Sequence, residues 1–377
     1  MAGIYIHIPF CKQACHYCDF HFSTSLKKKD ELVKALVREL ELRKDEFKNQ
    51  TIETIYFGGG TPSILTIDEL RLLISEVYKN YQVSDGPEIT LEANPDDLTN
   101  QRINELANTP INRLSIGIQS FFEQDLKLMN RAHNVDEAKR CLQEATKHFE
   151  NISLDLIYGI PGLSNERWLE NIETALSYNI PHISSYALTV EPKTALDTFI
   201  KKGVIANVDD DVAQEQFHIL IEKLVASGFV HYELSNFGKP GFFSKNNSAY
   251  WQGESYLGIG PSAHSFNGSE RGWNVRNNSK YIKAIAQNTL PMETEILSTT
   301  DKYNEYVMTG LRTMWGVSLE KVAQDFGIGY KNYILKQSQK HINEQLLYVD
   351  NGKLLVTKKG KFLSDGIASD LFKLNLR

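Results

Sequence analysis

The chain has 377 residues, of which 41% are hydrophobic, and a formal net charge of −6. This length suffices for one large α/β domain with a smaller unit, and the acidic balance argues against a general nucleic-acid surface. No apolar run approaches the roughly 18 residues that a membrane helix needs. The first residues show no basic segment followed by an apolar stretch, so we expect no signal peptide and a cytoplasmic protein.

The first half of the chain alternates short β-rich segments with helical ones. The expected strands are Gly3–Ile8, Thr54–Phe57, Glu88–Glu92, Arg113–Ile118, Ser153–Tyr158 and Ile183–Leu188. The expected helices are Asp30–Phe47, Ile67–Tyr81, Asn100–Ala107, Val135–Phe149 and Glu166–Ser177. This alternation predicts βα units and a parallel sheet that is either open or curved into a partial barrel, with ligands at the carboxyl ends of its strands.

An unusual segment follows each of the first five expected strands. In chain order these are the cysteine cluster, Gly58–Pro62, Glu92–Asp97, Gly117–Phe121 and Asp155–Gly162. Because the carboxyl ends of parallel strands meet at one edge of a sheet, we expect the five segments to form a single site.

The pattern changes after about residue 200, and we divide the chain into residues 1–200, 201–297 and 298–377. The middle part has a long helix, Val208–Ser227, and a stretch with little periodicity at 231–275. The last part has expected helices at Asp301–Met314, Ser318–Phe326, Ile334–Gln345 and Lys359–Leu371, and a hairpin of Leu347–Val349 and Lys353–Val356. The turn sequence Asp350-Asn351-Gly352 supports the hairpin, and helices with a small hairpin predict a winged-helix-like domain.

Three of the four cysteines, Cys11, Cys15 and Cys18, lie within eight residues in a C-x3-C-x2-C spacing. In a reducing compartment, clustered cysteines indicate a metal site rather than disulfides. The fourth, Cys141, lies in an amphipathic helical pattern and is expected to be a small buried side chain.

Two kinds of metal site are compatible with three clustered thiolates. A structural zinc would need a nearby histidine, His7, His16 or His21, because the chain has no second cysteine pair. A 4Fe–4S cluster would be held by the three thiolates alone, with one iron left open. We favour the cluster, whose open iron can chelate the amino and carboxylate groups of S-adenosylmethionine for radical chemistry.

The motifs YIHIPFCKQACHYCDF, YFGGGTPSIL, EANPDD, RLSIGIQSF and LDLIYGIPG resemble the radical S-adenosylmethionine superfamily. Within it, nearly the whole chain is similar to the coproporphyrinogen dehydrogenase group. The resemblance implies a partial (β/α)6 barrel followed by a small winged-helix-like C-terminal domain.

The resemblance also implies which residues surround S-adenosylmethionine. They are Tyr5, Tyr17, Gly59, Gly60, Thr61, Glu92, Gln119, Arg131, Asp155 and Ala187. Gly59, Gly60 and Thr61 would let the backbone approach the methionine amino group; a tight βα turn is the less favoured explanation of these glycines. Arg131 is expected to pair with a carboxylate.

Two departures indicate the branch of this group. The porphyrinogen-oxidising enzymes carry a further cysteine where this chain has Phe20. They also carry an N-terminal extension that contributes to the substrate site, whereas two residues precede the first expected strand here. Both departures point to the shorter relatives, the HemW-type haem chaperones, which the resemblance associates with a cluster, S-adenosylmethionine and haem.

That branch carries an HNxxYW motif linked to haem. At the matching place Asn247, Tyr250 and Trp251 agree with the motif, whereas Asn246 replaces the histidine. An asparagine amide is a poor iron ligand, while imidazole and phenolate are common haem ligands, so the axial ligand stays open. His231 and His264 are other candidates, but a lone histidine is more often structural.

Three functions are compared. A haem chaperone would bind the cluster, S-adenosylmethionine and haem and deliver haem to recipient haemoproteins; peripheral association with membrane haemoproteins is one option. A radical enzyme such as an oxygen-independent coproporphyrinogen III dehydrogenase is the alternative. An RNA-modifying enzyme or regulator is disfavoured by the acidic balance and by the lack of a basic recognition helix. We expect the chaperone, with no coproporphyrinogen dehydrogenase activity and no nucleic-acid partner.

Overall fold

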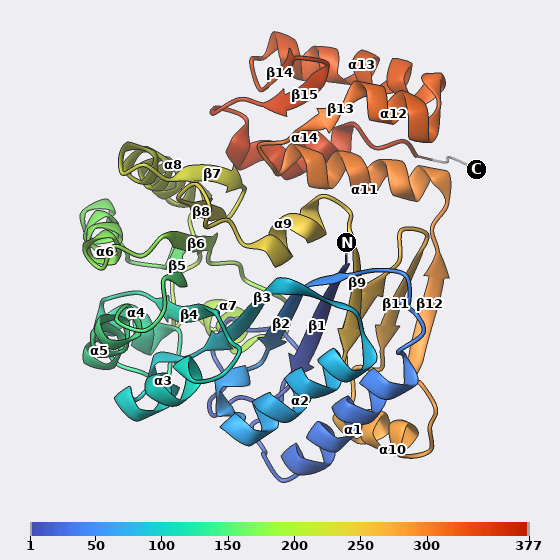
Figure 1. Ribbon diagram of the computed structural model, residues 1–377. Coiled ribbons are helices and arrows are strands. Elements are labelled where there is room, and N and C mark those ends of the chain that lie inside the picture. Colours follow the sequence, from blue (N-terminus) through green and yellow to red (C-terminus); the bar gives the residue numbers. More distant parts are fainter. Residues whose placement is uncertain (1, 375–377) are drawn as a thin grey trace.

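A computed structural model describes residues 2–374 of the chain (Figure 1). Twelve of the described strands form one large mixed sheet, and three more form a small sheet near the C-terminus. Buried apolar side chains form one core against the large sheet and a second core within residues 303–371.

Six parallel strands follow one another in chain order through the middle of the large sheet. They are β1 (Ala2–Ile8), β2 (Ile52–Gly59), β3 (Val83–Ala93), β4 (Arg113–Gln119), β5 (Asn151–Tyr158) and β6 (His182–Ala187). The helices between them are α1 (Lys29–Leu42), α2 (Ile67–Asn80), α3 (Asn100–Ala107), α4 (Glu123–Leu128), α5 (Val135–Ala145) and α6 (Asn165–Ser177). The sheet is curved and these helices cover its outer face, which confirms the α/β fold and the partial barrel (Figure 1).

Local sequence explains where these elements form. Thr66 and Asn134 cap α2 and α5, and in each case a glutamate three residues later completes a capping box. In β1, Ile4, Ile6 and Ile8 are fully buried in the core. Side chains two residues apart lie on the same face of a strand, so the three isoleucines fix which face of β1 meets the helices.

Residues 201–297 extend the large sheet at both edges. At one edge β7 (Val230–Glu233) and β8 (Asn236–Gly238) pair antiparallel beside β6. At the other edge β9 (Ser255–Ile259) runs parallel to β1, followed by the antiparallel strands β10 (His264–Phe266), β11 (Glu270–Asn274) and β12 (Met292–Ile296). Helix α7 (Ala195–Lys201) leads into this part, and its own helices are α8 (Asp210–Ala226), α9 (Lys245–Trp251) and α10 (Asn278–Ala286).

The last part, which we term the C-terminal unit (residues 299–374), has the element order of a winged helix. It contains α11 (Thr299–Leu311), β13 (Val317–Ser318), α12 (Leu319–Phe326), α13 (Ile328–Asn343), β14 (Leu347–Asp350) and β15 (Lys353–Val356). The winged-helix-like prediction is therefore confirmed. Several predicted bounds are wrong. Helix α11 ends at Leu311, three residues before the predicted end. Helix α13 starts at Ile328 because Gly327, with φ of 98°, ends α12 directly before it. The predicted last helix is a short 3-10 turn, Lys361–Leu363, followed by α14 (Ser364–Asp370).

The C-terminal unit lies above the amino ends of the parallel strands, with α9 between them (Figure 1). Helix α9 is tied to these ends because Glu88 accepts the N–H groups of Lys245 at 3.0 Å and of Asn246 at 3.1 Å. The Asn246 side chain is also engaged there, since its Oδ1 accepts a hydrogen bond from Thr54 Oγ1 at 3.2 Å. The cysteines follow β1 at the opposite ends of the strands. A seven-residue strand separates the two ends by about 20 Å.

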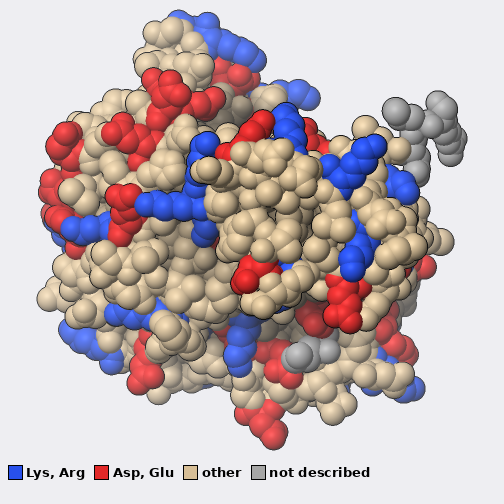
Figure 2. Space-filling view, turned by 90° about the horizontal axis from the view of Figure 1, so that it is seen from above, with Lys and Arg blue, Asp and Glu red and all other residues tan. Residues whose placement is uncertain are grey.

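The outer surface of the C-terminal unit is mixed in charge. Figure 2 shows that Lys and Arg side chains are interspersed with Asp and Glu on the face seen from above. Within residues 2–374, no helix combines the length and the apolar character that crossing a membrane requires.

Candidate functional site

A cavity of about 560 Å3 opens at the carboxyl ends of the parallel strands. Nearly all the residues predicted to hold the cluster and S-adenosylmethionine line it: Cys11, Cys15, Tyr17, Cys18, Gly59, Gly60, Thr61, Glu92, Gln119, Arg131, Asp155 and Ala187. Tyr5 is the exception. Its ring stacks on Tyr56 with 6.0 Å between centroids and its hydroxyl hydrogen-bonds His7 Nδ1 at 3.1 Å, one layer below the cavity.

The cysteine loop is held in place by the segment between α4 and α5. Gln13 Nε2 donates to the Asn130 carbonyl at 3.0 Å, and Asn130 Nδ2 donates back to the Ala14 carbonyl at 2.7 Å. The N–H of His16 donates to the Met129 carbonyl at 3.0 Å. The three thiols are free of disulfides, and burial raises the pKa of Cys18 to about 11. The loop therefore presents three thiols to one cavity from a fixed backbone.

The histidines near the loop are engaged elsewhere. His7 Nε2 contacts the His21 carbonyl at 3.1 Å, His16 Nδ1 contacts the Leu128 carbonyl at 2.8 Å, and His21 Nε2 contacts Asn278 Oδ1 at 2.7 Å. Among residues 2–374, no group of three His, Cys, Asp or Glu side chains surrounds the position of a single ion. A mononuclear zinc requires such a group, whereas a cluster takes each thiolate on a different iron. The described residues therefore form no ready mononuclear site at the cysteine loop.

The glycine run after β2 is explained by packing. A Cβ on Gly60 would lie 2.6 Å from the Phe10 carbonyl oxygen and 2.9 Å from that of Ile8. Gly59 has φ of 110°, and a Cβ there would lie 2.5 Å from the ring of His7. The absence of side chains is thus needed for the close approach of the ends of β1 and β2, whatever the cavity binds.

Two carboxyl groups face the cavity from neighbouring parts of the sheet. Glu92 accepts hydrogen bonds from Tyr56 Oη at 2.8 Å and from the Gly59 N–H at 3.2 Å, and burial raises its pKa to about 7. Asp155 accepts a hydrogen bond from Ser115 Oγ at 3.4 Å, and burial raises its pKa to about 7 as well. Near neutral pH these groups can either hold a proton or bind a cation.

These carboxyls predict that stability falls as the pH rises. Folded Glu92 and Asp155 keep their protons at pH 6, whereas the unfolded chain has released them near its ordinary values of 4.5 and 3.8. The folded state therefore binds more protons, and the free energy of unfolding should fall between pH 6 and 8 by roughly 1 kcal/mol per carboxyl. Denaturant unfolding of the cluster-free protein measures this fall. An equal fall in the double variant Glu92→Gln, Asp155→Asn would show that other groups cause it.

Arg131 lies directly beside the cysteines. Its Nη2 donates to Asn94 Oδ1 at 2.7 Å and to the Gly117 carbonyl at 2.8 Å, while Nη1 lies 3.4 Å from Cys15 Sγ. Its Nε is buried and has no hydrogen-bond partner within the described chain. Next to it, Gln119 has φ of 68°, a conformation that non-glycine residues adopt mainly where the surroundings enforce it.

The haem candidates lie at the other end of the barrel. Tyr250 and Trp251 line a second cavity of about 870 Å3 between α9, the edge of the sheet and the C-terminal unit. Asn247 is not among the residues that line it; its N–H donates to Ser244 Oγ at 3.3 Å. The structure therefore does not bring the haem candidates to the cysteines.

The two other histidine candidates lie outside both cavities. His231 is buried and has both ring nitrogens engaged, Nε2 with the Leu234 carbonyl at 3.1 Å and Nδ1 with Lys361 Nζ at 2.8 Å. Its ring stacks on Phe237 with 4.1 Å between centroids. His264 is exposed on β10, with its ring 6.1 Å from that of Trp273. The contacts of His231 are those of a structural residue.

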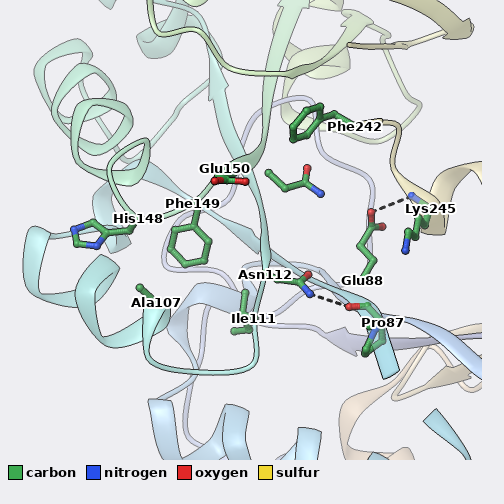
Figure 3. Close-up of a pocket in the computed structure, with 12 residues that line it drawn as sticks. Pro87, Glu88, Ala107, Ile111, Asn112, His148, Phe149, Glu150, Phe242 and Lys245 are labelled. Atoms are coloured by element: carbon green, nitrogen blue, oxygen red, sulfur yellow. Dashed lines mark hydrogen bonds between the residues drawn. The ribbon is translucent and has the colours of Figure 1, made fainter. Parts of the chain in front are cut away.

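A third cavity, of about 420 Å3, lies near the amino ends of β3 to β5 (Figure 3). Two polar side chains that line it are used within the chain. The Glu88 carboxylate turns toward the backbone N–H of Lys245, and Asn112 Nδ2 donates to the Pro87 carbonyl at 2.8 Å. We assign no ligand to this cavity.

Sequence reasoning missed a hydrogen-bonded chain inside the barrel. It starts from Asp155 and continues through Ser184, Ser153, His182 and Tyr232 to Ser244, the N-cap of α9. From Ser184 onward, the successive hydrogen bonds of this chain measure 3.1, 2.7, 2.8 and 3.3 Å between donor and acceptor. The signal was available: Ser153 and Asp155, like His182 and Ser184, are two residues apart in a strand and so share the inner face.

Comparisons with known proteins agree with this architecture. Residues 5–175 match the family model of the radical SAM superfamily, and residues 297–363 match that of the HemN C-terminal domain. The solved structure of Escherichia coli coproporphyrinogen III oxidase (HemN), a radical SAM enzyme, has the same fold, with a TM-score of 0.86 and 23% identity over 99% of this chain and 90% of that chain.

Similarity in sequence is higher to another set of proteins. The haem chaperone HemW of Bacillus subtilis is 34% identical over 371 residues, covering 97% of this chain and 98% of the relative. HemW of Lactococcus lactis is 33% identical over 365 residues, covering 96% and 95%. The resemblance stated from the motifs is confirmed, and the chain belongs to the HemW-type family of the radical SAM superfamily.

Proposed function

We propose that the protein is a haem chaperone that binds a 4Fe–4S cluster, S-adenosylmethionine and haem and delivers haem to recipient haemoproteins in the cytoplasm. The observation that carries this proposal is the match over nearly the whole chain to proteins named haem chaperones. The proposal keeps the division into a barrel (1–200), a connecting haem-associated region (201–297) and a C-terminal domain (298–377).

In this proposal the first cavity holds the cluster and S-adenosylmethionine. Cys11, Cys15 and Cys18 ligate three irons, and the bound cluster supplies an electron and an open coordination position. The backbone at Gly59–Thr61 and the Glu92 carboxylate face the methionine part. Arg131 lies beside Cys15 with an unused N–H that suits a carboxylate.

The remaining residues of the first cavity surround the nucleotide part in the same proposal. They are Tyr17, Gln119, Asp155 and Ala187, with Tyr5 supporting them from below. A volume of about 560 Å3 lies within the range of cavities that hold ligands of this size.

The alternative is a radical enzyme that acts on a porphyrinogen. The fold shared with the E. coli enzyme is compatible with it. Against it stands Phe20, an exposed residue (67% relative exposure) that lines the first cavity, at the position where the enzyme branch carries a cysteine. A phenyl ring cannot supply the acid–base or redox chemistry of a thiol.

One experiment separates the two functions. We expect the anaerobically reconstituted protein to develop a Soret band on addition of haem, and to pass the haem to an apo-haemoprotein added afterwards. We expect no conversion of coproporphyrinogen III in the presence of S-adenosylmethionine and a reductant. Decarboxylation of coproporphyrinogen, or no spectral change with haem, would refute the chaperone proposal.

A further inference from the structure

The second cavity, between the barrel and the C-terminal unit, supports a more specific assignment, which rests on the proposed function. We propose that haem binds in this cleft with its two propionates on Arg271 and Arg312, so that the C-terminal unit forms one wall of the haem site. The candidate motif supplies the other wall through Tyr250 and Trp251.

The shape and lining of the cleft suit a flat apolar ring. Its volume of about 870 Å3 is large enough for a drug-sized ligand. Aromatic side chains line it from both parts of the chain: Tyr250, Trp251 and Phe266 from the barrel side, and Tyr306 and Phe326 from the C-terminal unit. Aromatic faces pack well against planar ring systems, so both walls offer side chains on which a porphyrin can pack.

Two arginines join the walls of the cleft. Arg271 on β11 forms an ion pair with Glu305 on α11, with 2.7 Å between Nη2 and Oε1. Arg312, at the end of α11, places its guanidinium 5.1 Å from the ring centre of Trp251 on α9. The propionates of haem are carboxylates, and guanidinium groups bind carboxylates through two parallel hydrogen bonds.

Both arginines are available to bind a haem propionate in addition to, or in place of, their present protein carboxylate. Arg312 donates to Asp365 through Nη1 at 3.0 Å, but its Nε is buried without a partner among the described residues. The Arg271–Glu305 pair is partly exposed on both sides. Ion pairs of this kind contribute little to stability, so replacing the protein carboxylate by a propionate costs little.

Two acidic residues of the cleft, Asp301 and Asp325, are engaged by other partners, whereas Glu305 competes with the propionate for Arg271. Glu305 contacts Arg271, Asp325 forms an ion pair with Lys321 at 2.7 Å, and Asp301 accepts the hydrogen bonds of Ser298 at the start of α11.

The cleft also offers iron ligands without a histidine. The described residues that line it include no histidine, but they include the Tyr250 phenol and the Met308 thioether, both of which ligate haem iron in proteins. Asn246, which replaces the motif histidine, does not line the cleft and hydrogen-bonds Thr54 instead.

The test compares variants that break the same contact from its two sides. Arg271→Ala and Glu305→Ala both remove the ion pair between the walls, but only the first removes a propionate partner. Titration of each reconstituted protein with ferric haem should give about tenfold to one-hundredfold weaker binding for Arg271→Ala and for Arg312→Ala. Glu305→Ala should bind at least as tightly as the unchanged protein, and Arg140→Ala, on the exposed face of α5, should be neutral.

A second probe isolates the propionates. Haem dimethyl ester has no carboxylates, so its affinity should be the same for the unchanged protein and for the double variant Arg271→Ala, Arg312→Ala. Circular dichroism of each variant checks the fold. The Soret band of the haem complex should shift in one of the two variants Tyr250→Phe and Met308→Leu, because the proposal makes one of these two side chains the iron ligand.

The outcomes separate this inference from the proposed function. Binding of haem by the double variant with unchanged affinity would overturn the cleft assignment and leave the chaperone function standing. Equal weakening by Arg271→Ala and Glu305→Ala would also overturn it, because the effect would then come from the contact between the walls. Failure of the unchanged protein to bind haem would refute the proposed function itself.

Discussion

Replacing Cys15 by alanine is expected to leave the protein unable to hold an iron–sulfur cluster. Alanine has no donor atom, so the loop would offer two thiolates to the cluster instead of three. Iron and sulfide content and the visible absorption after anaerobic reconstitution should fall almost to the values of a protein without a cluster. Cys11→Ala and Cys18→Ala should behave in the same way.

The matched control is Cys141→Ala. This cysteine is fully buried in α5, where its thiol donates to the Ala138 carbonyl at 3.2 Å, away from the cavity. Its loss removes one small buried group and should lower the free energy of unfolding by about 1 kcal/mol while leaving the cluster intact. Retention of the cluster by Cys15→Ala would contradict the assignment, as would loss of the cluster in Cys141→Ala.

Glu39→Ala should lower the free energy of unfolding by about 3–5 kcal/mol. The carboxylate is fully buried, and Oε1 accepts hydrogen bonds from Arg43 Nη1 at 3.2 Å and Asn274 Nδ2 at 2.7 Å. Oε2 accepts from the Gly260 N–H at 2.8 Å and from Tyr281 Oη at 2.5 Å. Truncation would leave the Gly260 N–H and the Tyr281 hydroxyl buried without this acceptor. It would also remove one partner each from Asn274 Nδ2 and from Arg43, whose guanidinium keeps its ion pair with Glu46.

Denaturant unfolding followed by circular dichroism measures this loss. Glu41→Ala, two residues away on the same helix, serves as the control because Glu41 is only partly buried, with 37% of its side chain exposed, and contacts Arg38 at the surface. It should change the free energy of unfolding by less than about 0.5 kcal/mol. A similar loss in both variants would mean that helix propensity, rather than the buried network between α1 and the β9–β11 edge, sets the effect.

The central strands and the first cavity were predictable because their signals are local. Each of the six parallel strands is a short β-rich segment before a helix, and each unusual motif follows such a strand. The carboxyl ends of parallel strands meet at one edge of the sheet. This rule places Cys11, Glu92 and Asp155 around one cavity without knowledge of any distance. Tyr5 was predicted with them, but its side chain packs against Tyr56 and hydrogen-bonds His7, and it is not among the residues that line the cavity.

The edges of the sheet and the position of the haem candidates were not predictable in this way. Strand β9 pairs with β1 from more than 250 residues away, Ala2 lying opposite Ser255, and nothing in either segment specifies the other. Strands β8 and β10 have three residues each, too few for a periodic pattern. The sequence around Tyr250 does not indicate at which end of the barrel the motif lies. Its position at the amino ends of the strands is set by the contacts of Glu88 and Thr54 with α9.

The placement of α9 at the amino ends of the strands has a chemical consequence. A short-lived radical reacts only with atoms that it touches, and a packed barrel interior about 20 Å long separates the cysteines from Tyr250. Under the proposed function, haem bound against Tyr250 would lie out of reach of a radical formed at the cysteines. It would then leave the protein with the same covalent structure with which it arrived.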